Sequence, residues 1–140
     1  MFILNGRGLK IEIREKKERA MKVLKNIEGE KVLSLAELVS YNEGQIISRT
    51  LVQNRHVSLT LFAFDKGEEI SSHSSSGDAM VTVLDGTARI TVGDSTYTVR
   101  SGQSIAMPAD IPHALYAEEP FKMLLIVAFP PQTGQEVKKV

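Results

Sequence analysis

Residues 67–79 read GEEISSHSSSGDA, and residues 102–117 read GQSIAMPADIPHALYA. Each stretch opens on a glycine and places a histidine at a set distance behind it, His73 in the first and His113 in the second. The first stretch continues through MVTVLDG to Gly86. Neutral imidazole is the side chain that proteins use most often to hold a first-row transition metal. These stretches therefore indicate where the fold and any metal chemistry of the chain are to be sought.

The spacing of these residues resembles the two sequence motifs of the cupin superfamily. The first motif is written G-x5-H-x-H-x3-E-x6-G, and the second is written G-x5-P-x-G-x2-H-x3-N. The positions that carry the expected residue are Gly67, His73, Gly86, Gly102, Pro108 and His113. At the other four positions the residue differs. In the first motif Ser75 replaces the second histidine and Ala79 replaces the glutamate. In the second motif Asp110 replaces the glycine and Ala117 replaces the asparagine. The resemblance covers residues 67–117 directly and extends through neighbouring apolar stretches to 45–129.

The resemblance implies an all-β fold, an antiparallel double-stranded β-helix or jelly-roll barrel of the small, single-domain cupin 2 type. It also implies that His73 and His113 face the barrel interior near one another, with Ser75, Ala79 and Met107 lining the pocket. Because two of the four ligand positions are Ser75 and Ala79, the motif is degenerate and lacks its carboxylate. We expect the barrel to bind a small molecule, with His73 and His113 as the candidate ligands of a divalent metal (Zn, Mn, Fe or Ni).

The same two histidines have a second interpretation, as partly buried side chains that hydrogen-bond to serine hydroxyls and backbone without a metal. Other donors considered for the site are Asp78, Asp110 and His56. Asp78 would face away from the barrel on a regular strand, and only a bulge would turn it inward. Asp110 is typical of a turn residue, and His56 of a surface histidine. Side chains alternate along a strand, so His73, Ser75 and Ala79 are expected to share a face if no bulge intervenes.

The middle of the chain independently predicts an all-β sandwich or barrel. Apolar and β-branched runs recur between turn residues, without helices between them. They predict strands near 45–52, 57–64, 79–84, 88–92, 96–100, 104–107, 113–117 and 121–129, after a short helical turn at 35–39. The pair Asp85-Gly86, between two apolar runs, predicts a β-hairpin.

Two of these predicted strands are apolar on both faces. Residues 123–129 read MLLIVAF without polar alternation, and residues 59–64 read LTLFAF. A small antiparallel fold normally leaves one face of a sheet to solvent, and that face is then polar. We therefore expect a second surface to cover the outer face, in a homodimer formed through the sheet, as the resemblance to small cupins also implies.

Composition limits the class of protein. The chain has 140 residues, 42% of them hydrophobic, with a formal net charge of zero, which suits a single soluble domain. It contains no cysteine, which excludes disulfides, thiolate catalysis and cysteine-based zinc sites. No stretch approaches the ~20 apolar residues of a membrane helix, and the opening MFIL is too short for a signal-peptide core. We expect a cytoplasmic protein without a membrane partner.

The N-terminal region is basic and differs from the rest of the chain. We divide the sequence into an extension at 1–44, a barrel at 45–130 and a tail at 131–140. The charges of the extension are interleaved, with helical pairs such as Glu15–Arg19, so a nucleic-acid partner is not expected. Alternating apolar residues over 9–13 predict a short strand. The natural start of the protein is Met1 or, alternatively, Met21.

Three classes of function fit these observations. The leading hypothesis is a small cupin that binds a metabolite in its barrel. An alternative is a cupin enzyme, an oxygenase or isomerase in which a metal or a histidine base acts on a small carbonyl or carboxylate substrate. Loss of the carboxylate ligand disfavours ordinary iron dioxygenase chemistry. The third is a partner-binding module whose pocket is vestigial.

Overall fold

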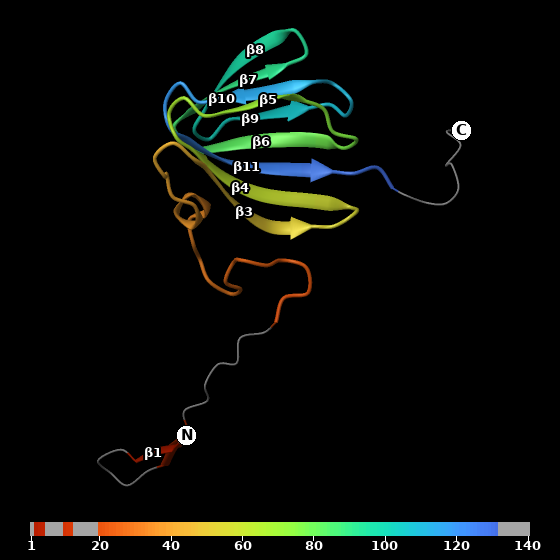
Figure 1. Cartoon of the computed structure of the whole chain (residues 1–140). Coiled ribbons are helices and arrows are strands. Elements are labelled where there is room, and N and C mark those ends of the chain that lie inside the picture. Colours follow the sequence, from red (N-terminus) through yellow and green to blue (C-terminus); the bar gives the residue numbers. More distant parts are fainter. Residues whose placement is uncertain (1, 5–9, 13–19, 132–140) are drawn as a thin grey trace.

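The computed structural model describes residues 2–4, 10–12 and 20–131. Within them the main body is all-β, with nine strands in two antiparallel sheets (Figure 1). One sheet has the order β3-β4-β11-β6-β9 and the other β5-β10-β7-β8. The strands are β3 (Ile46–Gln53), β4 (Val57–Phe64), β5 (Glu69–His73), β6 (Asp78–Asp85), β7 (Thr87–Val92), β8 (Ser95–Arg100), β9 (Ser104–Met107), β10 (His113–Tyr116) and β11 (Phe121–Ala128). This is the double-stranded β-helix expected from the sequence.

The predicted strands are all present, and their ends differ by at most one residue from those expected. The predicted helical turn is a short 3-10 helix, η1 (Leu35–Leu38). Strand β5 is the exception, because its sequence EISSH was not expected to form a strand. Only Ile70 of its five residues is partly buried, so no apolar alternation marks it.

The prediction of a hairpin at Asp85-Gly86 is wrong. Strand β6 lies in the five-stranded sheet and β7 in the four-stranded sheet, so the chain crosses between sheets at Gly86 instead of folding back. Gly86 has φ +72°, and a Cβ there would lie 2.3 Å from the carbonyl oxygen of Pro120. The glycine is therefore required by a tight corner between sheets, because no L side chain fits at that distance.

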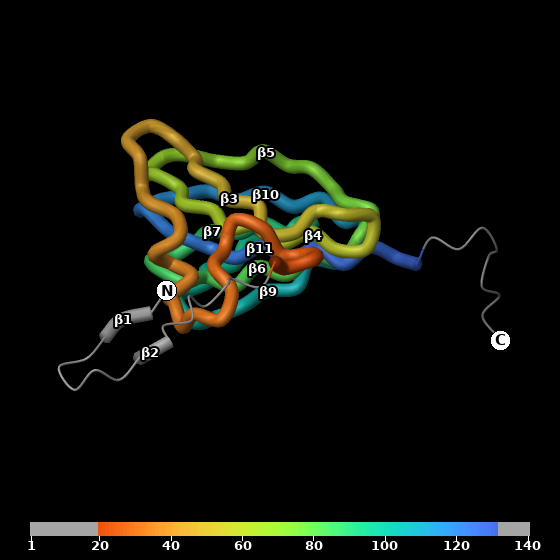
Figure 2. Tube along the Cα trace, turned by 90° about the horizontal axis from the view of Figure 1, so that it is seen from below, coloured from red at the N-terminus to blue at the C-terminus, as the bar shows by residue number. Residues whose placement is uncertain are grey.

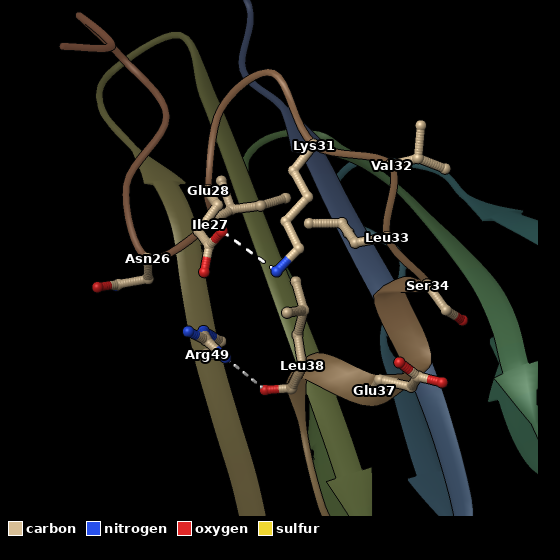
Figure 3. Close-up of a pocket in the computed structure, with 10 residues that line it drawn as sticks. All are labelled: Asn26, Ile27, Glu28, Lys31, Val32, Leu33, Ser34, Glu37, Leu38 and Arg49. Carbon is tan, nitrogen blue, oxygen red and sulfur yellow. Dashed lines mark hydrogen bonds and ion pairs between the residues drawn. The ribbon is translucent and has the colours of Figure 1, made fainter. Parts of the chain in front are cut away.

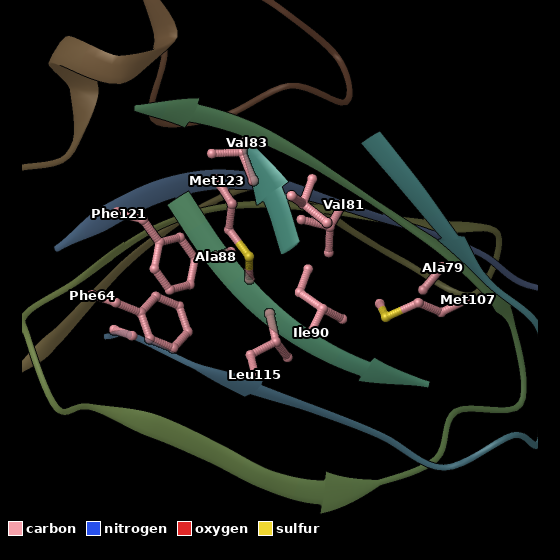
Figure 4. Close-up of a cluster of buried hydrophobic side chains, with 12 residues drawn as sticks. Phe64, Ala79, Val81, Val83, Ala88, Ile90, Met107, Leu115, Phe121 and Met123 are labelled. Atoms are coloured by element: carbon pink, nitrogen blue, oxygen red, sulfur yellow. The ribbon is translucent and has the colours of Figure 1, made fainter. Parts of the chain in front are cut away.

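The interior of the barrel is filled by apolar side chains from both sheets (Figure 4). Phe64 and Phe121 stack with their ring centroids 4.5 Å apart. Met107 and Met123 also lie in this cluster, and each is at most 1% exposed. This inner core holds the two sheets together through the hydrophobic effect, at roughly 25 cal/mol per Å² of apolar area removed from water.

A second apolar cluster lies on the outer face of the five-stranded sheet. Residues 20–45, which we call the lead-in segment, run against this face (Figures 1 and 2). The lead-in contributes Ile27, Leu38 and Val39, which pack with Leu61 and Ala63 of β4. Part of the outer apolar face is therefore covered by the chain itself. Dimerisation through the rest of that face stays a prediction.

Polar contacts attach the lead-in segment to the barrel. The Lys25 amide and the Asn26 side chain donate to the carbonyls of Leu51 and Thr50 on strand β3, each over 2.8 Å. The Tyr41 hydroxyl donates to Asp85, and this bond follows burial among the causes that raise the pKa of Tyr41. The bonds act at both ends of the segment, so they orient its apolar residues toward the sheet.

The lead-in receives a further anchor from strand β11. Lys122 donates from Nζ to the carbonyl oxygen of Ala36 over 2.7 Å. The same amine lies 4.9 Å from the centre of the Tyr41 ring, within the range of a cation–π contact. One side chain of the barrel therefore contacts both η1 and the end of the lead-in.

The N-terminal ribbon consists of β1 (Phe2–Leu4) and β2 (Lys10–Glu12), which pair antiparallel. Strand β2 falls within the strand predicted at 9–13. The predicted helical pair Glu15–Arg19 and most of the C-terminal tail lie outside the described residues. In the part of the chain that the structure describes, no helix is long and apolar enough to cross a membrane.

Candidate functional site

The two histidines meet at one end of the barrel, which we call the mouth. Strand β5 ends at His73 and β10 begins at His113, and the two residues are cross-strand partners. Their ring centroids are 4.3 Å apart, and the ring planes are inclined by 66°. The proximity implied by the cupin resemblance is therefore present in the fold.

Each histidine ring is held by a backbone carbonyl two residues before it. His73 Nδ1 lies 3.0 Å from the oxygen of Ser71, and His113 Nδ1 lies 3.3 Å from that of Ile111. Because a carbonyl oxygen only accepts, each bond requires the proton on Nδ1. In the neutral ring this leaves the lone pair on Nε2, the arrangement that orients a histidine for metal binding or proton transfer.

The two rings differ in their environment. His113 is buried, with 5% of its surface exposed, whereas His73 is exposed. Burial lowers the pKa of His113, and the neighbouring charge of His73 lowers it further. The pair thus favours at least one neutral imidazole, the form that can bind a metal or accept a proton.

The three predicted lining residues occupy different positions around this end. Ala79 on β6 and Met107 on β9 are cross-strand partners, buried in the inner core. Ser75 lies in the loop between β5 and β6, and its hydroxyl oxygen accepts from the amide of Gly77 over 3.1 Å. The condition under which His73, Ser75 and Ala79 would share one strand face is not met, because the strand is interrupted between His73 and Asp78.

Two aspartates near the mouth have structural roles. Asp78 accepts from the amide of Ala109 over 2.8 Å, which ties β6 to the loop after β9. Asp110 has φ +63°, and its amide donates to the carbonyl of Ser75 over 2.8 Å. It keeps the left-handed conformation for which the motif has glycine, a conformation that aspartate tolerates better than most residues.

The third histidine lies in the turn between β3 and β4. His56 is exposed, and its ring accepts from Nε of Arg55 over 3.3 Å. Its backbone carbonyl accepts from the amide of Phe129 over 3.0 Å. Across residues 2–4, 10–12 and 20–131, no group of three or more His, Asp or Glu residues could hold a metal ion. The candidate centre therefore consists of His73 and His113.

Pattern reasoning missed a pocket that lies between the lead-in segment and β3 (Figure 3). Its charged lining residues are Glu28, Lys31, Glu37 and Arg49. The available signal was Arg49, a charged residue within the otherwise uncharged strand IISRTLVQ. The lead-in was interpreted as an appended extension, so its contact with that strand was not expected.

Comparison with known proteins agrees with the fold and the motif spacing. The family model described as a cupin domain matches residues 60–127. A conserved protein of unknown function from Streptococcus pyogenes has a solved structure that is 54% identical, with a TM-score of 0.79, covering 81% of this chain and 100% of its own. A cupin superfamily protein from Desulfitobacterium hafniense is 34% identical, with a TM-score of 0.73 and coverage of 76% and 98%.

The curated proteins include a more distant relative. An uncharacterized protein of Streptomyces coelicolor is 29% identical over 92 residues, which cover 66% of this chain and 86% of that protein. The match to the family model falls on strands β4 to β11, which carry both motifs. From its motifs, its barrel and these relatives, the chain belongs to the cupin superfamily.

Proposed function

We propose that the protein binds a small anionic molecule at the barrel mouth, with a divalent metal ion held by His73 and His113. The observation that carries the proposal is the pair of imidazoles 4.3 Å apart, each with Nδ1 bound to a backbone carbonyl. This arrangement leaves one Nε2 lone pair on each of two neighbouring rings, and imidazole nitrogens are common donors to a protein-bound metal.

The residues present also limit the identity of the ion. The sequence alone left zinc, manganese, iron and nickel as candidates. Imidazole suits zinc, iron and nickel, whereas manganese prefers carboxylate and water oxygens. Ala79 supplies no carboxylate at the mouth, and Asp78 is engaged by Ala109. We therefore favour zinc, iron or nickel at His73 and His113.

The preference for an anionic ligand follows from charge. Two neutral imidazoles leave the full double charge of a divalent ion uncompensated. A bound ion would act as a Lewis acid toward an oxygen atom of the ligand. Since the barrel behind the histidines is filled by Met107, Ile90 and other apolar side chains, the ligand is expected to be small and to bind at the mouth.

Metal analysis tests the first half of the proposal. The full chain, purified without a nickel column, is loaded with Zn²⁺, Fe²⁺ or Ni²⁺ and its bound metal is measured. We expect about one ion per chain and loss of binding in His73→Ala and His113→Ala. His56→Ala is the matched control, because His56 is an exposed histidine outside the pair. Less than a tenth of an ion per chain under every condition would refute the metal centre.

Ligand titration tests the second half. Thermal-shift and calorimetric measurements compare small carboxylates and keto acids with neutral sugars, on the metal-loaded and the metal-free chain. The proposal predicts that only the acids bind, and that they bind more tightly when metal is present. Acid binding that is equally tight without metal and in the His73→Ala and His113→Ala variants would contradict a ligand site at the metal. A flat response to every compound would contradict ligand binding at the mouth.

A further inference from the structure

A pocket of about 550 Å³ lies outside the barrel, between the lead-in segment and strand β3 (Figure 3). Its walls come from residues 26–28 and 31–34, from η1 and from Arg49 of β3. Small-molecule sites are typically clefts of roughly 300–1,000 Å³ with an apolar lining and a few polar groups. The pocket has this size, and neither His73 nor His113 lines it.

The most informative residue of this pocket is Arg49. Its cross-strand partner is Leu61, which is fully buried in the outer apolar cluster. Arg49 is itself partly buried, and its Nη1 donates to the carbonyl oxygen of Leu38 over 2.8 Å. An apolar side chain at this position would extend the cluster, so an arginine here calls for a polar partner.

The guanidinium of Arg49 is only partly satisfied by that bond. It carries five N–H donors in a planar fork, and the Leu38 carbonyl accepts one of them. Among the residues that the structure describes, Arg49 forms no ion pair with a carboxylate. A planar fork of donors is the group that binds a carboxylate through two parallel hydrogen bonds.

A second cation lies in the same pocket. Lys31 Nζ is 3.3 Å from Glu28, but both side chains are more than half exposed, at 59% and 64%. Exposed pairs of this kind contribute little, so Lys31 can exchange Glu28 for a bound anion at small cost. In Figure 3 the Lys31 side chain extends across the pocket above Leu38, with Glu37 on the opposite side from Arg49.

The other lining residues determine which chemical groups a ligand can carry beside its negatively charged group. Ile27 and Leu38 are half-buried apolar residues that belong both to the pocket and to the outer cluster. They offer an apolar surface beside the two cations. We propose that this pocket binds a small organic anion, a carboxylate on an apolar body, with the carboxylate on Arg49 and Lys31. The site is separate from the barrel mouth and independent of any metal there.

Amide chemical shifts measured by NMR on the full chain, without added metal, test this proposal. Benzoate is the probe and benzamide its neutral counterpart of the same shape. We expect benzoate to shift the amides of residues 26–38 and 48–50, and benzamide to shift them at least about tenfold more weakly, because a charge-assisted pair is lost. Shifts confined to residues 73–79 and 108–113, or none at all, would overturn the proposal.

Variants separate recognition from support of the fold. Arg49→Gln is expected to weaken benzoate binding about tenfold or more, and Arg49→Lys to weaken it less, since the charge remains but the fork is lost. Lys31→Met provides a second test that leaves the Arg49–Leu38 bond intact, and His56→Ala, at an exposed histidine outside both sites, is the control that should bind normally. If Arg49→Gln unfolds, Lys31→Met decides the outcome. Unchanged affinity in Lys31→Met and in any folded Arg49 variant would refute the site.

Discussion

The two faces of the five-stranded sheet are covered in different ways. The inner face meets a second sheet, and its residues Phe64 and Phe121 are fully buried. The outer face meets an irregular segment, and although Leu61 is fully buried there, Met21 and Val32 of the covering segment are exposed. The inner contact is therefore a continuous core, whereas the outer one depends on a few side chains and polar anchors. We expect the two faces to contribute unequally to stability.

The largest expected difference is between truncations on the two sides. Phe121→Ala removes a fully buried ring stacked on Phe64, and we expect it to lower the free energy of unfolding by about 3–5 kcal/mol. Leu38→Ala, in the lead-in, is only half-buried, and about 1–2 kcal/mol is expected from its smaller change in buried area. Urea unfolding of the two variants measures both. Equal losses would show that the outer cover is as tightly packed as the core.

Two glycine substitutions compare the tight corner between the sheets with an open turn. Gly86→Ala introduces a Cβ 2.3 Å from the Pro120 carbonyl and also strains a left-handed residue, so we expect a loss well above 2 kcal/mol. Gly102 has φ +85° with nothing within 4 Å of an added Cβ. Gly102→Ala should therefore cost only the conformational term, about 1–2 kcal/mol. Thermal unfolding of the pair measures the contribution of the corner between sheets.

The anchor at Tyr41 tests how strongly the outer cover is attached. Tyr41→Phe removes the hydroxyl that donates to Asp85 but keeps the ring near Lys122. We expect a loss of about 1 kcal/mol, the usual net value of a hydrogen bond. Hydrogen exchange should show faster opening of residues 36–41 with little change in β6 or β11. Uniform acceleration across the barrel would mean that the lead-in and the core open together.

The buried histidine makes stability depend on pH in the weakly acidic range. The pKa of His113 is lowered in the fold, chiefly by burial, so below the ordinary value of about 6.5 the unfolded chain binds more protons than the folded one. Stability should therefore fall as the pH drops below about 6.5 and be fully present above it. Unfolding of the metal-free chain between pH 5 and 8 measures the slope, which should shrink in His113→Asn. An unchanged slope would assign the effect to other groups.

Association is the last of these tests, because it concerns what the lead-in leaves uncovered. Met80 on β6 is 40% exposed, and its cross-strand partner Ile126 on β11 is half-buried. We propose that a second copy of the chain covers this remaining part of the outer face. Light scattering coupled to size-exclusion chromatography should give twice the mass of one chain, and Met80→Glu should reduce it. A monomer at micromolar concentration would leave the lead-in as the sole cover.

Much of the fold could be predicted because turn residues separate apolar runs of strand length. The strands at 57–64 and 104–107 have the predicted bounds. The pairing of strands was harder, since Asp85-Gly86 specifies a turn but not the sheet that the next strand joins. Strand β5 escaped detection because its residues are mostly exposed and polar, and its place is set by pairing with β10.

The site was predictable to a similar extent. The resemblance to the cupin motifs implied that His73 and His113 would lie together, and their rings do. It could not indicate that the backbone leaves strand geometry between His73 and Ala79, nor that Asp78 is engaged by the amide of Ala109. These details depend on contacts with the loop after β9, which is distant in sequence. The pocket around Arg49 depends likewise on the folding of the lead-in back onto β3.

The bonds from Lys25 and Asn26 to β3 have a consequence for where this protein can be cut. Strand β3 is the edge of its sheet, and an open edge offers unpaired backbone groups to other chains. The lead-in occupies part of that edge through the carbonyls of Thr50 and Leu51. The stretch that matches the cupin family model begins at residue 60, inside β4, and leaves out both β3 and its cover. A fragment trimmed to that stretch would leave the rest of β4 as an open, uncovered sheet edge. Such a fragment would be prone to aggregate.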